Sequence, residues 1–162
     1  MIRLFISVVL LLCVGGGAVA QQAEELRGLT RLGLLVEGID QEAQRCGITR
    51  NLIRDAIAYT ISSSKLKFSD DDSSGPKLYV RVGALVQRQP VQCFSNVSFD
   101  VVNIQKVQLD YRDEPPSYTV LQLWHDDWLE VSVPEKHSQQ VRVAIENATK
   151  KLIAAWYLAN KP

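Results

Sequence analysis

Hydrophobic and polar residues alternate along two long stretches in the middle of the chain. The hydrophobic side chains fall at every second position from Lys77 to Arg88, and the same pattern runs through 91–112. Because side chains on a β-strand point in turn to opposite faces of a sheet, this period predicts strands with one buried face. Asn103 and Gln105 interrupt the second hydrophobic face, and we interpret them as a frayed sheet end. Shorter apolar runs predict further strands at 29–36, 65–69 and 118–125.

Two other stretches have the spacing of amphipathic helices, with apolar residues at i, i+3 and i+4. The first covers 50–62 and is expected to be capped by Thr49, while Asp40 is expected to cap a short helical turn before it. The second is a long helix that closes the chain, with Ser132 and Glu135 at capping-box spacing and Ser138 as the alternative cap. Its predicted buried stripe is Val141, Ile145, Ala148, Leu152, Ala155, Trp156 and Ala159.

The order of these elements predicts an α+β fold. We expect a two-layer sandwich in which two main helices lie on one face of an antiparallel meander sheet of four or five strands, in the order β-α-β-β-β-β-α. There are no internal repeats and no linker that would divide the chain. The predicted organisation is therefore a flexible lead-in at 21–28, followed by a single domain at 29–160.

The first 20 residues differ from the rest in composition. Arg3 precedes an apolar run from Leu4 to Val14, and the segment ends in Ala-Val-Ala at Ala20. This arrangement is typical of a secretory signal peptide, and the apolar run is shorter than the roughly 20 residues of a permanent membrane span. We expect cleavage and export to the periplasm or the medium. An uncleaved anchor, or a lipoprotein acylated at Cys13, is the alternative, which the bulky Leu12 disfavours.

Charge and cysteine content indicate which partners the mature protein can bind and whether its cysteines form a disulfide. Loss of Arg3 changes the formal net charge from zero to −1, so the chain lacks the basic field that attracts nucleic acid or anionic lipid. Cys46 and Cys93 remain, an even number in an oxidising compartment, which predicts one disulfide between them. Two buried free thiols or a reactive thiol are the alternatives.

The segment from Leu121 to Ser132 contains the densest group of chemically reactive side chains. His125, Asp126 and Asp127 could bind a metal ion or form a base with its orienting carboxylate. Adjacent residues on a strand, however, point to alternate faces and do not converge on one ion. We therefore expect Trp124 and Trp128 to pack while the polar residues between them form a solvated turn or bulge. The chain also has no P-loop, G-x-G-x-x-G or G-x-S-x-G motif.

The chain contains three short motifs: a lead from Leu26 to Leu29, a strand end at Val36-Glu37, and a helix start at Gly47-Ile48-Thr49. Together they resemble a family of small secreted bacterial proteins to which no activity is assigned. The likeness continues through the later strands and the C-terminal helix. The chain departs from the family pattern at His125 to Trp128, where such proteins are more often rich in glycine and serine. The resemblance implies an exported bacterial protein and no mechanism.

These observations favour a non-enzymatic module that binds an envelope protein. Its candidate partner surface is the outward face of the strand at 77–88, with Tyr79, Arg81, Leu85 and Gln87. We expect no cofactor, no metal, no nucleic acid partner and no stable membrane anchor after cleavage. A small-ligand carrier, or a metal-dependent enzyme that uses His125 with Asp126 or Asp127, is the alternative. The sequence leaves the oligomeric state open.

Overall fold

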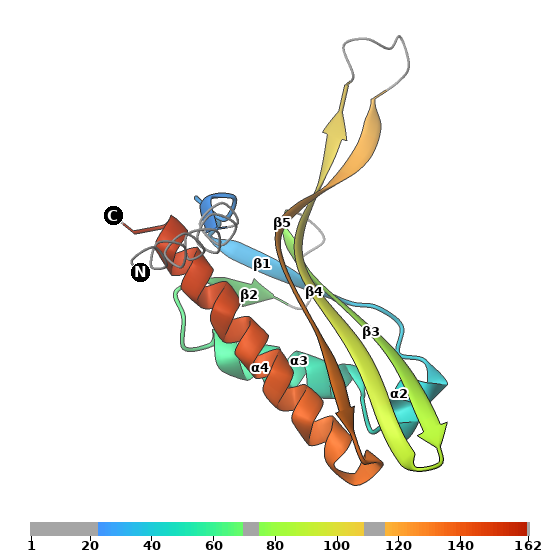
Figure 1. Cartoon of the computed structure of the whole chain (residues 1–162). Coiled ribbons are helices and arrows are strands. Elements are labelled where there is room, and N and C mark those ends of the chain that lie inside the picture. The colour runs from blue at the N-terminus through green and yellow to red at the C-terminus, as the bar shows by residue number, and fades with distance from the viewer. Residues whose placement is uncertain (1–22, 70–74, 109–115, 162) are drawn as a thin grey trace, which may run out of the picture.

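The computed structural model describes residues 23–69, 75–108 and 116–161. The predicted signal peptide, with Cys13, lies outside the described residues. Five strands form one sheet: β1 (Arg31–Val36), β2 (Lys67–Ser69), β3 (Lys77–Arg88), β4 (Val91–Val107) and β5 (Ser117–Ser132). The helices are α2 (Gln41–Arg45), α3 (Arg50–Ile61) and α4 (Pro134–Ala159). The long helix α4 packs beside α3 on one face of the sheet (Figure 1), and the predicted α+β fold is confirmed.

The direction of the strands differs in part from the predicted meander. The sheet order is β2-β1-β3-β4-β5, and the last three strands are antiparallel, as expected. However, β1 is parallel to both of its neighbours, β2 and β3. The reason is that α2 and α3 carry the chain back from the end of β1 before β2 begins, and such a crossover joins parallel strands. The sheet is therefore mixed.

The helix starts follow the sequence prediction in two cases of three. Asp40 accepts a hydrogen bond from the backbone N–H of Ala43, and Thr49 accepts one from that of Leu52. By contrast, α4 begins with a proline at its first turn and no side-chain cap. The fixed φ of proline suits this position, and its missing N–H leaves one fewer donor to satisfy. The hydroxyl of Ser132 bonds to His137 instead of capping the helix.

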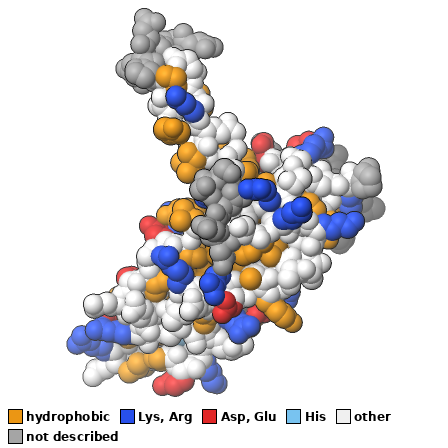
Figure 2. Space-filling model, turned by 180° about the vertical axis from the view of Figure 1, so that it is seen from behind, with side chains coloured by type: hydrophobic (Ala, Val, Ile, Leu, Met, Phe, Trp, Pro, Cys, Tyr) orange, Lys and Arg blue, Asp and Glu red, His pale blue; other side chains and the backbone are white. Residues whose placement is uncertain are grey.

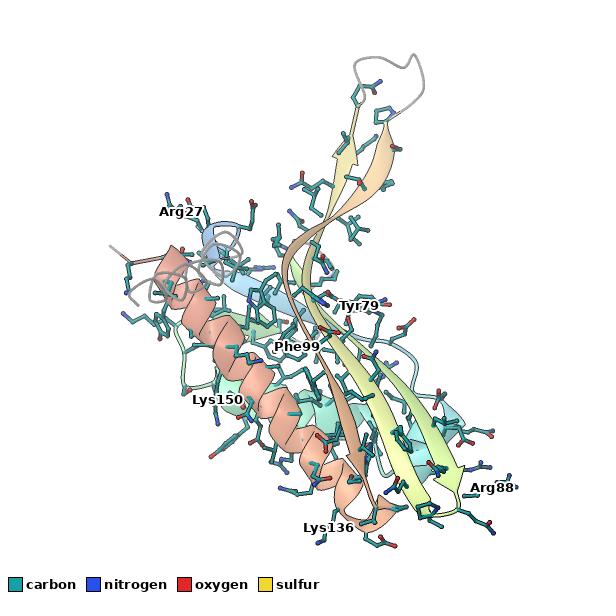
Figure 3. All side chains as sticks on the ribbon, viewed as in Figure 1. Arg27, Tyr79, Arg88, Phe99, Lys136 and Lys150 are labelled. Carbon is teal, nitrogen blue, oxygen red and sulfur yellow. A yellow bond between two sulfur atoms is a disulfide. The ribbon has the colours of Figure 1, made fainter. Side chains whose placement is uncertain are left out.

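The core lies between the inner face of the sheet and the helices. Phe99 on β4 is fully buried there, with its ring centroid 6.2 Å from those of both Trp124 and Trp128 on β5. Figure 3 shows Phe99 on the side of the sheet that faces α4, and Tyr79 on the other side. Every residue of the predicted α4 stripe is buried. The predicted Cys46–Cys93 disulfide is confirmed, and it joins the end of α2 to β4.

The described part of the predicted lead-in packs against the body of the protein. Leu26 is fully buried. The side chain of Asn160, just after α4, accepts a hydrogen bond from the N–H of Gly28 and donates one to the carbonyl of Leu26. Ala23 and Leu26 thus anchor this segment to the core, while residues 24, 25, 27 and 28 are exposed. Among the described residues, no helix is long and apolar enough to cross a bilayer.

The hairpin of β4 and β5 extends beyond the helices as a projecting arm (Figure 1). We define the arm as residues 102–107 and 117–122. It begins at an irregularity in the register, where Val101 pairs with Trp124 but Val102 pairs with Gln122. Bulges of this kind bend a strand and increase its twist. Asn103 and Gln105, predicted at a frayed sheet end, lie on this arm, and Figure 2 shows hydrophobic side chains exposed along it.

Candidate functional site

Strand alternation separates β3, β4 and β5 into two faces. Cys93, Ser95, Val97, Phe99 and Val101 on β4 are all buried toward the helices. The intervening residues point the other way, where none of the described helices covers the strands. We call this second surface the open face. It comprises the odd-numbered residues of β3 from 79 to 87, the even-numbered residues of β4 from 92 to 100, and the odd-numbered residues of β5 from 125 to 131.

A single buried carboxylate organises the polar part of the open face. Asp100 is only 2% exposed, although it lies on the side away from the helices. Its Oδ1 accepts from Gln122 Nε2 at 2.6 Å and is 2.7 Å from His125 Nδ1. Its Oδ2 accepts from Ser98 Oγ at 2.7 Å and from Arg81 Nη2 at 3.2 Å. Three strands thus contribute donors to one acceptor, which fixes their side chains relative to one another.

The charge state of Asp100 follows from the same contacts. Burial alone would raise its pKa, but the hydrogen bonds from Ser98, His125 and Gln122 outweigh that effect and hold the pKa below its usual value. Asp100 is therefore ionised at neutral pH. An ionised carboxylate only accepts hydrogen bonds, so the proton between the two groups lies on Nδ1 of His125. In the neutral imidazole this leaves Nε2 as the proton acceptor, on the solvent side.

The structure brings together only two of the three residues in the predicted His-Asp-Asp cluster. His125 and Asp127 lie on the open face, with Nε2 of the histidine 3.4 Å from Oδ1 of Asp127. Asp126 lies on the opposite face, where it accepts from Lys151 of α4 at 2.9 Å. The expected turn at these residues is wrong, because β5 continues through them; the bulge lies two positions earlier, at Leu123.

A shallow groove of about 380 Å³ runs across this part of the open face. It is lined by Arg81, Gly83, Asn96, Ser98, His125 and Asp127. The glycine contributes no side chain, which leaves a hollow on the β3 side. Across the described residues, no three His, Cys, Asp or Glu side chains are placed to hold a metal ion together. His125 and Asp127 would supply two ligands, so the groove is better suited to polar recognition than to tetrahedral metal binding.

All four residues of the predicted partner surface lie on the open face. Arg81 is centred 5.5 Å above the ring of Tyr79, a cation–π distance, and Leu85 is 63% exposed. Burial and the neighbouring Glu37 raise the pKa of Tyr79, so its hydroxyl is protonated at neutral pH. The sequence pattern did not predict a role for Asp100, the central carboxylate of this cluster. Its position between Phe99 and Val101 could have indicated one, because a charged residue on an otherwise apolar strand needs polar partners.

The second histidine belongs to the core. His137, at the start of α4, is fully buried, with Nε2 2.7 Å from Ser95 Oγ and Nδ1 2.7 Å from Ser132 Oγ. Burial lowers its pKa, against an opposing effect from Glu130. It is therefore neutral and links β4, β5 and α4. Because no solvent reaches it, we assign it to structure and not to the site.

A larger groove, of about 530 Å³, lies between α3 and α4 on the helical side. Its walls include Tyr59 and Tyr157, and its other lining residues mix charges, hydroxyls and aliphatic groups. It does not lie between the sheet and the helices, where an apolar ligand carrier would hold its ligand. Glu146 in its lining forms an ion pair with Arg142 at 3.0 Å within α4, whereas Asp100 on the open face accepts from residues of three strands.

Comparison with known proteins adds little. No protein-family model matches the sequence, and no curated protein matches it. A solved structure of a minor lipoprotein from Acinetobacter baumannii is similar over 79% of this chain and 90% of that chain, with 8% sequence identity and a TM-score of 0.37. A likeness of that size carries no argument, so the functional interpretation rests on the site itself.

Proposed function

We propose that the protein is an exported, non-enzymatic module that binds a protein partner through its open face. One observation carries this proposal: exposed aliphatic side chains adjoin a fixed polar cluster on a sheet face that α2, α3 and α4 leave uncovered. Leu85, Leu129 and Val131 are exposed there, and Asp100 fixes the polar groups beside them. Apolar anchors next to preorganised polar groups are typical of protein interfaces.

Two observations support export. Cys46 and Cys93 are buried and joined by a disulfide, and such bonds persist in oxidising compartments such as the periplasm or the medium. The apolar segment at the start of the sequence, with its Ala-Val-Ala ending, has the composition of a secretory signal. We propose periplasmic or secreted location on these grounds, and an envelope protein as the class of partner.

A site-specific crosslinking experiment tests the proposal. A photoreactive phenylalanine analogue replaces Leu85 in cells that express the protein at native level, and Val143 on the exposed side of α4 is the matched control position. We expect a discrete protein adduct from position 85 and none from position 143. Adducts of equal yield at both positions, or none at position 85, would contradict the proposal.

The variant Leu85→Asp sharpens the same test. It places a charge where the partner is expected to remove water, so adduct formation from a probe at Leu129 should be lost. Because Leu85 is exposed on the open face, the free energy of unfolding should change by less than about 0.5 kcal/mol. Denaturant unfolding of the purified variant provides this control.

A second candidate function is small polar ligand binding in the groove, with His125 as a proton acceptor. The observation that favours it is the 2.7 Å contact between Asp100 and Nδ1 of His125, which leaves Nε2 facing the groove. Native mass spectrometry of untagged protein would detect a retained ligand. A retained mass that His125→Ala loses would support this candidate, and a bare chain mass would count against it.

A further inference from the structure

The cross-strand register arranges the open-face side chains in rows that run from β3 through β4 to β5. Three consecutive rows are Arg81–Ser98–Asp127, Gly83–Asn96–Leu129 and Leu85–Phe94–Val131. In each row the β3 and β5 ends complement one another. The first row has a cation at one end and an anion at the other. The second has a residue without a side chain opposite a large aliphatic one. The third has two aliphatic ends.

A surface with this property fits a second copy of itself. Two copies can pack with their open faces together, related by a two-fold axis that is parallel to β4 and midway between the two sheets. Rotation about this axis places β3 of one copy opposite β5 of the other, and each row then faces the same row of the second copy. Each end would then face its complement, as an isologous interface requires. We propose that the open face binds the open face of a second copy, forming a symmetric dimer. This inference rests on the proposed function and names its partner.

The charged row provides two equivalent ion pairs. Half of the Arg81 side chain and 62% of the Asp127 side chain are exposed. Toward the other described residues, Arg81 donates through Nη2, to Ser98 and Asp100. A guanidinium has five N–H donors, so others remain for Asp127 of the second copy. Packed sheets lie about 10 Å apart, a gap that an arginine and an aspartate can bridge together.

The second row provides a knob and a hollow. Leu129 is 67% exposed, the largest exposed fraction among the aliphatic side chains of the open face. At Gly83, an added Cβ would meet no atom within 4 Å, and this glycine lines the 380 Å³ groove. In the dimer, Leu129 of each copy enters the hollow over Gly83 of the other. The third row then buries Leu85 against Val131 of the second copy, with Phe94 on the axis.

The first test fills the hollow. Sedimentation velocity of the exported chain over a dilution series should give a dimer, and Gly83→Phe should raise the dimer dissociation constant by about tenfold or more. The matched control is Val143→Phe on α4, which should leave the dissociation constant unchanged. Circular dichroism and thermal unfolding check that each variant is folded. A wild-type chain that is monomeric throughout, or a dimer that Gly83→Phe leaves intact, would overturn the inference.

The second test uses the ion pairs. Chains carrying Arg81→Glu or Asp127→Arg should each be monomeric alone, because like charges would meet twice in either homodimer. Mixed in equal amounts, they should form a heterodimer, because both pairs are then of opposite charge. A mixture that stays monomeric would overturn the inference. If loss of the Arg81–Asp100 contact unfolds the first variant, Asp127→Arg alone must still weaken the dimer, or the inference fails.

The crosslinking probe at Leu85 separates this inference from the proposed function. An adduct with twice the mass of the chain, together with a dimer in solution, supports both. An adduct with a different protein, together with a monomer in solution, overturns the dimer and leaves the proposed function standing. A monomer without any adduct overturns both.

Discussion

The two faces of β4 use histidine in opposite ways. On the inner face, Ser95 bonds to His137, which is fully buried, neutral and enclosed by hydroxyl groups. On the open face, Asp100 bonds to His125, whose other nitrogen faces a groove and a second carboxylate. The inner arrangement satisfies polar groups that the core has removed from water. The open arrangement fixes charged groups while leaving them accessible. Changes on the inner face should therefore lower stability, whereas changes on the open face should weaken binding.

The largest expected effect is on the inner face, at the disulfide. Replacing Cys46 and Cys93 by serine should lower the free energy of unfolding by about 4 kcal/mol on the chain-entropy model, since the bond spans 47 positions. Denaturant unfolding of the double variant against the oxidised wild type measures this. A change below about 1 kcal/mol would contradict the chain-entropy prediction.

His137→Ala should come next. The change leaves a cavity in the core and removes the partner of two buried or half-buried hydroxyls, those of Ser95 and Ser132. We expect a loss of about 3 kcal/mol in unfolding free energy. His125→Ala is the matched variant on the open face, and it should cost clearly less. Equal losses of unfolding free energy for the two histidine variants would contradict the structural role of His137 and the binding role of the open face.

Asp100→Asn tests whether the open face is held as rigidly as the structure indicates. The amide keeps the shape but replaces one acceptor by a donor that faces existing donors from Ser98 and Arg81. We expect a loss of about 1–2 kcal/mol and weaker partner crosslinking at Leu85. Unfolding and crosslinking should be measured on the same preparation. Crosslinking that survives unchanged would show that recognition does not depend on the polar cluster.

The smallest effect should be the pH dependence that His137 creates. Its pKa is lowered in the folded state from an ordinary value of 6.5, so below that pH the unfolded chain binds a proton that the folded chain does not. Stability is therefore full above pH 6.5 and falls as the pH drops toward the folded pKa, by at most about 1.4 kcal/mol per unit. Unfolding from pH 7.5 to 5 should show this decline, and His137→Gln should flatten it.

The sequence was sufficient for features that depend on local periodicity. The alternation in 77–88 placed Tyr79 and Arg81 on a face away from the core, and the α4 stripe is buried because a helix presents every third or fourth residue to one side. Asp40 and Thr49 cap their helices as predicted, since a cap needs only residues three positions apart. The disulfide followed from the two cysteines that remain after the predicted signal peptide, Cys46 and Cys93.

Contacts between residues that are distant in the sequence depend on the tertiary structure alone. Asp100 meets Arg81 and His125 only because β4 lies between β3 and β5 in one particular register, and a shift of one residue would send every side chain to the other face. The parallel direction of β1 depends on where α3 returns the chain. Ser132 could have capped α4, but its hydroxyl forms a hydrogen bond with the buried His137 instead. Local patterns fix elements and their faces; the partners of charged groups depend on which elements pack together.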